Sequence, residues 1–252
     1  MLIGYGIPPA SVALVGGTWL TDDGGAALFD GRPARRARIT RTGALAINIT
    51  LAEAIVPGII AVLGLNVPPG VLVTAAGASA TTIRLPDGSV CAWLFPTGNA
   101  LVSAVAVTIA TVVTNVDVGE IAVFSAVEVG ITDGWAVARF DSSLHNRTKG
   151  SQVNTVPGPT YRKLTATLSG RPTEVARKGG LAGTDWETVG VALSGRRRGC
   201  VVPQYRDMMT KAFDPVLAAR TALYGYATQL PTVENISRQY FRGTLEFEEI
   251  PG

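Results

Sequence analysis

Short apolar stretches separated by turn residues run along most of the chain. Between positions 44 and 51 every second residue, from Leu45 onward, is Leu or Ile, and this period of two is typical of a half-buried strand. One of the turns, Pro86-Asp87-Gly88, combines residues that favour a tight reversal. Further strands are expected at 59–66, 71–75, 81–85, 90–95, 101–111 and 119–129. This spacing predicts a β-sandwich of the jelly-roll kind.

The second half of the chain has a looser pattern. Strands are expected at 135–140, 161–168, 189–193, 200–202, 224–226 and 241–247. The polar stretch 141–160 predicts an exposed loop, and 170–188 is ambiguous. Residues 207–223 form the one good helix candidate, which Pro215 would cap or kink. The fold class predicted from both halves is all-β, with one short helix in the second.

The two halves of the chain differ in their content of charged residues. Residues 1–131 contain six Arg, no Lys and eight acids, whereas residues 132–252 contain sixteen Lys or Arg and eleven acids. This change in composition predicts two domains: a jelly-roll-like sandwich over 1–131 and a mainly-β domain with a basic surface over 132–252.

The overall composition narrows the class of protein. Apolar residues make up 47% and charged residues 16%, which disfavours both disorder and a coiled coil. Residues 54–83 and 88–116 are uncharged and long enough to cross a bilayer, but proline, glycine and asparagine interrupt both. We therefore expect no membrane span, and the residues after Met1 suggest no signal peptide.

Candidate chemistry is sparse, and no catalytic, cofactor-binding or metal-binding residue is nominated. His145 is the only histidine and lies in the polar stretch, where we expect it to be solvated. Cys91 and Cys200 are too far apart for a zinc site and are expected to be small buried residues. No phosphate-binding or dinucleotide-binding glycine motif is present, so no cofactor is expected.

Two pairs of adjacent carboxylates were weighed as glycosidase residues. Asp22-Asp23 lies in a glycine-rich turn, and Glu248-Glu249 lies near the C-terminus, where an exposed end is expected. Adjacent side chains of an extended chain point to opposite faces, so neither pair converges on one substrate. A glycosidase that uses more distant acids remains an alternative.

The cluster Arg196-Arg197-Arg198 is the densest positive charge in the chain. Nucleic-acid binding is the most specific function that this cluster could have, but no nucleic-acid-binding motif surrounds it. A solvated surface, or one that faces an acidic neighbour, is favoured, and the cluster receives no assigned role. The four tryptophans, Trp19, Trp93, Trp135 and Trp186, are expected to pack in a core or an interface.

The order of these elements resembles the minor tail, or distal-tail (baseplate), proteins of long-tailed bacteriophages. In the first half the resemblance rests on an early Trp, an Arg-rich strand, the strand Ile59–Asn66 and the segment Asp117–Ile121, which is similar to the closing strand of their carbohydrate-binding-module-like jelly roll. In the second half it rests on Trp135, Tyr161–Leu164, Leu223–Gly225 and Tyr240–Glu249, which are similar to an appended domain of the same proteins.

This resemblance implies a structural role in the virion. The chain would form a homo-oligomeric ring or an adaptor between the tail tube and the hub or fibres, after assembly in the host cytoplasm. Its partners would be other tail and baseplate proteins, with a host-surface glycan as a further candidate and without nucleic acid. The low charge of residues 1–131 agrees with permanent interfaces, which are depleted in Lys and Glu. A carbohydrate- or receptor-binding module is the main alternative, and an enzyme is the least favoured class.

Overall fold

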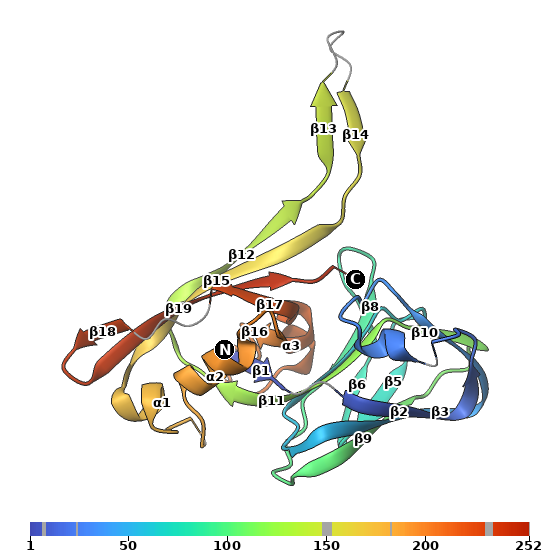
Figure 1. Ribbon diagram of the computed structural model, residues 1–252, viewed down its shortest axis with the longest axis horizontal. Helices are drawn as coiled ribbons and strands as arrows, with labels where there is room; N and C mark the ends of the chain where they lie inside the picture. The colour runs from blue at the N-terminus through green and yellow to red at the C-terminus, as the bar shows by residue number, and fades with distance from the viewer. Residues whose placement is uncertain (7–8, 24, 148–152, 182, 230–233, 252) are drawn as a thin grey trace.

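The computed structural model describes the chain except for residues 7–8, 24, 148–152, 182, 230–233 and 252. Antiparallel strands dominate it, so the predicted all-β class is confirmed (Figure 1). The first half folds as a jelly-roll-like sandwich of two sheets, and one of these sheets continues into the second half.

A six-stranded sheet forms one layer of the sandwich. Its order is β10-β3-β9-β5-β6, and β2 pairs along the other side of β3. The strands are β2 (Pro9–Trp19), β3 (Ala37–Ile55), β5 (Leu72–Ala75), β6 (Ala78–Thr81), β9 (Val102–Ile109) and β10 (Asn115–Val118). Strand β3 contains the alternating stretch at 44–51 and also the Arg-rich residues before it.

An eleven-stranded sheet forms the other layer and extends beyond it. Its order is β12-β15-β19-β17-β16-β1-β11-β4-β8-β7, and β18 pairs with β19. The sandwich part comprises β4 (Ile59–Leu63), β7 (Ile83–Arg84), β8 (Val90–Leu94) and β11 (Glu120–Glu128). The remainder comprises β1 (Leu2–Tyr5), β12 (Ile131–Asp141), β15 (Thr160–Pro172), β16 (Arg198–Val202), β17 (Leu223–Gln229), β18 (Glu234–Ser237) and β19 (Tyr240–Glu249).

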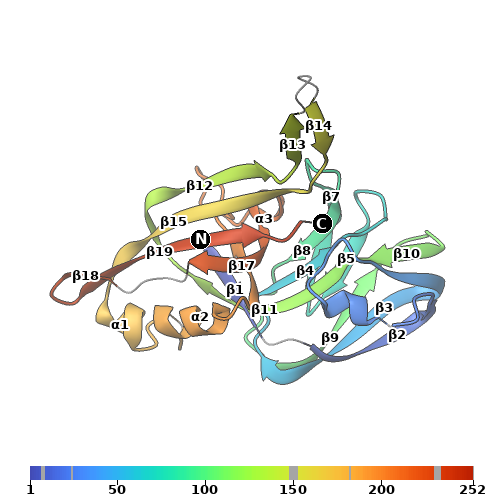
Figure 2. The same cartoon turned by 45° about the horizontal axis from the view of Figure 1, so that its top comes forward.

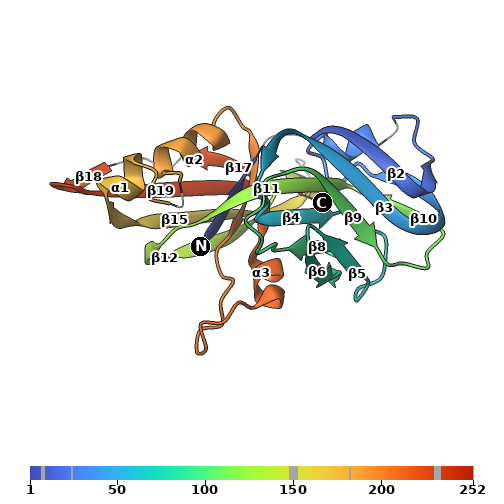
Figure 3. The same ribbon diagram turned by 90° about the horizontal axis from the view of Figure 1, so that it is seen from below.

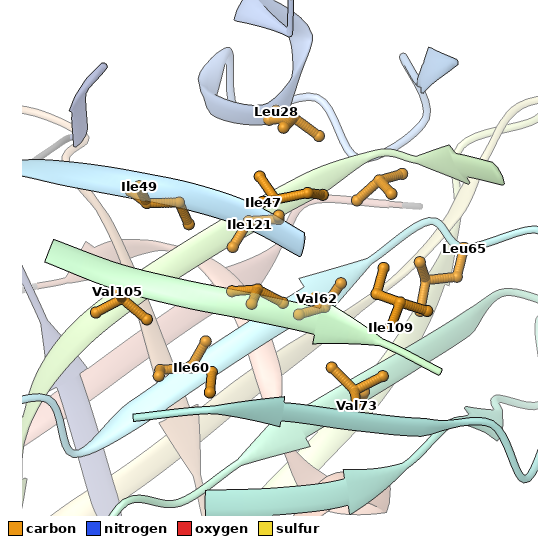
Figure 4. Close-up of a cluster of buried hydrophobic side chains, with 14 of the residues drawn as sticks. Leu28, Ile47, Ile49, Ile60, Val62, Leu65, Val73, Val105, Ile109 and Ile121 are labelled. Atoms are coloured by element: carbon orange, nitrogen blue, oxygen red, sulfur yellow. The ribbon is translucent and has the colours of Figure 1, made fainter. Parts of the chain in front are cut away.

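The sandwich core lies between its two sheets (Figure 4). Ile47 and Ile49 of β3 face Ile60 and Val62 of β4, and all four are inaccessible to solvent. Strands β4 and β8 are buried over their whole length, because their other faces pack in a separate cluster that includes Trp93 and residues from the second half. Continuous apolar runs are typical of strands buried on both faces.

Helices cover the second half of the large sheet on both sides (Figure 3). Helices α1 (Thr173–Arg177) and α2 (Trp186–Leu193) lie on one side, and α3 (Pro215–Thr221) lies on the other. Trp186 of α2 packs in a core with Leu164 and Phe247 of the sheet. A short 3-10 helix, η1 (Ala26–Phe29), lies against the sandwich.

Three expectations for local structure in the second half were wrong. Residues 189–193 belong to helix α2 rather than to a strand, because Asp185 caps the helix by accepting a hydrogen bond from the Thr188 N–H at 2.8 Å. The helix expected at 207–223 begins only at Pro215, where Asp214 provides the cap. The described residues of the second half therefore form three α-helices, whereas one was expected.

The third correction concerns residues 141–160, which were expected to be a loop. Strands β13 (Leu144–Arg147) and β14 (Val153–Val156) pair there as an antiparallel ladder. Together with the outer ends of β12 and β15 they form an arm, here defined as residues 140–147 and 153–161. The arm stands away from the rest of the molecule (Figures 1 and 2).

The predicted division at residue 131 stays a prediction, because the sheet is continuous across it. Strand β11 pairs with β4 through residues 120–124 and with β1 through residues 125–128. Strand β1, from the start of the chain, also pairs with β16. The first half therefore contributes a strand to the middle of the sheet in the second half.

Candidate functional site

Glu120 joins the sandwich to the second half of the molecule. It begins β11, and only 2% of its surface is exposed. One carboxylate oxygen accepts a hydrogen bond from the Gly31 N–H at 2.8 Å, and the other accepts from the Tyr224 hydroxyl at 2.9 Å. Nη1 of Arg198 lies 3.4 Å from the same oxygen as Tyr224. One buried carboxylate thus connects the loop after η1 with β16 and β17.

Burial sets the protonation of this group. Removal from water raises the pKa of Glu120 from 4.5 to about 7, although Tyr224, Arg198 and the Gly31 N–H all act in the opposite direction. Burial also raises the pKa of Tyr224, and the adjacent Glu120 raises it further. The tyrosine therefore remains a neutral hydrogen-bond donor to the carboxylate.

The Arg196–Arg198 cluster lies at the same junction. Arg198 donates from Nη1 to the Phe29 carbonyl at 2.7 Å, so it holds η1 against the start of β16. Arg196 and Arg197 are exposed, and the Arg196 guanidinium lies 5.9 Å from the Tyr226 ring centroid. One arginine of the cluster is therefore structural, and the other two border the solvent.

A pocket of about 710 Å³ opens between these groups. Phe29, Phe124 and Tyr224 give it an apolar lining, and the arginine cluster borders it. Glu120 also lines the pocket, but hydrogen-bond donors already occupy both of its oxygens. The pocket has room for a small molecule, and the side chains that line it offer no paired nucleophile and base.

A second buried ion pair holds the C-terminal strand. Arg162 of β15 donates from Nε to Glu249 at 2.8 Å and from Nη2 to the Ala222 carbonyl at 2.8 Å. Burial opposes the charge of Arg162, but the bond to Glu249 outweighs it and raises the arginine pKa. The expectation that Glu248-Glu249 is an exposed end is therefore wrong for Glu249, whose side chain is 13% exposed.

The other residues singled out in the sequence are not brought together. Cys91 and Cys200 are free and buried, as predicted. His145 lies on β13, where its backbone pairs with Thr155. Asp23 forms an ion pair with Arg35 at 2.9 Å, and Glu248 accepts from the Tyr226 hydroxyl at 3.1 Å. Within the described ranges, no three His, Cys, Asp or Glu residues form a group able to hold a metal ion.

The tryptophans divide between core and surface. Trp93 and Trp186 are buried, and Trp19 is partly buried against the sandwich core. Trp135, at the start of the regular part of β12, is 38% exposed. The expectation of core packing is thus confirmed for three of the four, and Trp135 lies on the surface.

The arm carries apolar side chains in solvent. Leu144 is 63% exposed and Val156 is 50% exposed. Phe140 and Tyr161 stack across the two strands with ring centroids 5.5 Å apart. A hairpin that exposes large apolar side chains away from a core is more typical of a binding surface than of a free monomer.

Sequence reasoning missed both Glu120 and the arm. A single acid inside the apolar stretch Val118–Phe124 was the available signal for Glu120, since buried charges occur mostly where partners hold them. The signal for the arm was weaker, because its strands are short and largely polar.

None of the helices in the described part of the chain has the length and apolar character needed to cross a bilayer. A scan against protein-family models matches no family, and searches of curated proteins and of solved structures find no similar protein.

Proposed function

We propose that this chain is a structural subunit of the tail tip of a long-tailed bacteriophage, forming a ring or adaptor between the tail tube and the hub or fibres. The observation that carries the proposal is the arm, whose apolar side chains stand in solvent away from both cores. A subunit surrounded by neighbours would bury them. The resemblance of the sequence segments at 59–66, 117–121 and 240–249 to those of distal-tail proteins points to the same role.

Two further observations agree with a structural role. Two polar groups that line the pocket, Glu120 and Arg198, hold the molecule together, since both bind other parts of the chain. The sandwich also has no lysine on its surface, which favours permanent contacts over free solvation.

Antibody labelling of purified tailed particles tests the proposal directly. Antibodies raised against this chain should label the distal end of the tail in electron micrographs, and the chain should appear in the particles by mass spectrometry. Particles that are infectious and lack the chain would overturn the proposal.

A carbohydrate-binding module is the second candidate, and the stacked pair Phe140 and Tyr161 favours it. Both rings lie on the arm, where Phe140 is 42% exposed and Tyr161 is partly buried, and an aromatic surface is suited to stacking on a sugar. A glycan array would separate the two candidates. Tight glycan binding that Phe140→Ala abolishes, by a chain that stays monomeric, would favour the carbohydrate-binding function over assembly.

A further inference from the structure

Two long strands of this molecule have one edge without a partner among the described residues. Strand β12 is the last strand at one end of the eleven-stranded sheet, where it pairs only with β15. Strand β2 pairs only with β3 and borders the six-stranded sheet. Each is eleven residues long. An open edge offers a row of backbone N–H and C=O groups to another chain.

The two edges carry only part of the usual protection against pairing. Proteins keep such edges apart with charged side chains (lysine above all), proline, bulges or very short strands. Strand β2 contains no charged residue and no proline after Pro9, whereas β12 contains neither lysine nor proline but carries Arg139 and Asp141. Bulges interrupt β2 at residues 15–17 and β12 at residues 131–135, which leaves regular ladders at 11–15 and 135–141.

The two edges lie far apart within one molecule. In all three views β2 lies at the opposite end of the molecule from β12 (Figures 1, 2 and 3). One copy therefore cannot pair its own two edges, and two copies are needed. The halves that carry them also differ in charge, because residues 1–131 have a net charge of −2 and residues 132–252 a net charge of +5. Opposite net charges favour contact between unlike halves.

We infer that β12 of one copy pairs with β2 of a second copy, so that copies associate head to tail through their sheets. This inference rests on the proposed assembly function and names the surface that performs it. A head-to-tail contact uses two different surfaces, so it closes into a ring when the rotation between neighbours permits.

The test places a lysine on each edge in turn. Ala13 of β2 and Ala136 of β12 are exposed, and the residues opposite them within the chain, Asn48 and Thr165, are uncharged. We expect Ala13→Lys and Ala136→Lys each to raise the dissociation constant of the oligomer about tenfold or more, measured by light scattering over a concentration series. Ser79→Lys, on the exposed edge strand β6, is the matched control and should assemble like the wild type.

Mixing the two variants gives a sharper result. Each retains one intact edge, so the mixture should form dimers and stop there, at concentrations at which each variant alone is monomeric because its own contact is weakened. Assembly of Ala13→Lys alone at wild-type strength would overturn the inference, because a contact between two β12 strands does not need β2.

Disulfide trapping gives an independent measurement that does not depend on disrupting the contact. Single cysteines at Ala10 or Ala13 are mixed with single cysteines at Ala136 or Ala138, with the buried Cys91 and Cys200 left in place. A disulfide between a β2 cysteine and a β12 cysteine of different chains supports the inference. A wild type that assembles while no such pair is trapped overturns the inference but leaves the assembly function intact. A wild type that is monomeric at every concentration overturns both.

Discussion

The eleven-stranded sheet is covered by other layers to a different extent in the two halves of the molecule. In the sandwich, β4 and β8 are buried along their whole length by layers on both faces. In the second half, no described side chain of β12 is buried, although the strand is twice as long. Burial in this fold follows from what covers a strand, since β4, β8 and β12 are all rich in apolar residues. The uncovered strands are therefore the ones available to another molecule.

The largest expected effect contrasts a buried ion pair with an exposed one. Glu249→Ala leaves Arg162 buried without its carboxylate, so we expect the free energy of unfolding to fall by about 3–5 kcal/mol. Glu234→Ala breaks the exposed pair with Arg242 and should cost far less, because water screens that pair. Urea denaturation measures both, and equal losses would contradict the contrast.

Removal of one apolar side chain should cost more in the sandwich than in the arm. Ile60→Ala opens a cavity between two sheets, and we expect a loss of about 2–5 kcal/mol. Leu144→Ala removes an exposed side chain from β13 and should change stability by less than about 0.5 kcal/mol. A comparable loss for Leu144→Ala in the monomer would show that the arm is packed.

The junction between the halves should respond to pH. The folded pKa of Glu120, about 7, lies above its ordinary value of 4.5, so the folded state retains a proton that the unfolded state releases. The resulting stability is fully present below about pH 4.5 and is lost as the pH rises through 7. Relative to Glu120→Gln, which cannot titrate, the wild type should lose on the order of 3 kcal/mol across this window.

Chemical denaturation at a series of pH values measures this difference. Tyr224→Phe supplies the control, because loss of the hydroxyl donor to the carboxylate should raise the Glu120 pKa and move the window to higher pH. A difference between the wild type and Glu120→Gln that does not change with pH would contradict the assignment.

The smallest predicted effect concerns the helices that distinguish the second half. Asp214 accepts hydrogen bonds from the backbone N–H groups of Val216 and Leu217 at the start of α3. Asp214→Ala should lower the free energy of unfolding by about 1 kcal/mol. Asp214→Asn should lower it much less, because the asparagine oxygen also accepts these hydrogen bonds. Equal losses in the two variants would show that the cap bonds do not stabilise α3.

The sequence was more informative about the sandwich than about the second half. Period-two alternation located β3 and β9, and short apolar runs bounded by turn residues located β4, β5, β8 and β11. Helix α2 was missed because Val189 and Val191 are β-branched, a residue type that favours strands, while the Asp185 cap and the packing of Trp186 stabilise a helix instead. Local patterns do not contain such tertiary contacts.

The contacts at the junction between the two halves could not be predicted from the sequence, for a related reason. Gly31, Glu120, Arg198 and Tyr224 are far apart in the sequence, and only the shared sheet brings them together. No spacing rule connects such residues. The Arg196–Arg198 cluster was visible as a run of charge, but its division into one structural and two exposed arginines depends on where β16 begins.

Strand β1 also determines when each half is able to fold during synthesis. Leu2 pairs with Glu128 on one side and with Val202 on the other. Once residue 128 has left the ribosome, every strand of the sandwich has been released, so the sandwich core is able to form before the second half is complete. The second edge of β1 has no partner strand until β16 has been translated. One edge of β1 therefore stays open from the synthesis of β11 until the synthesis of β16.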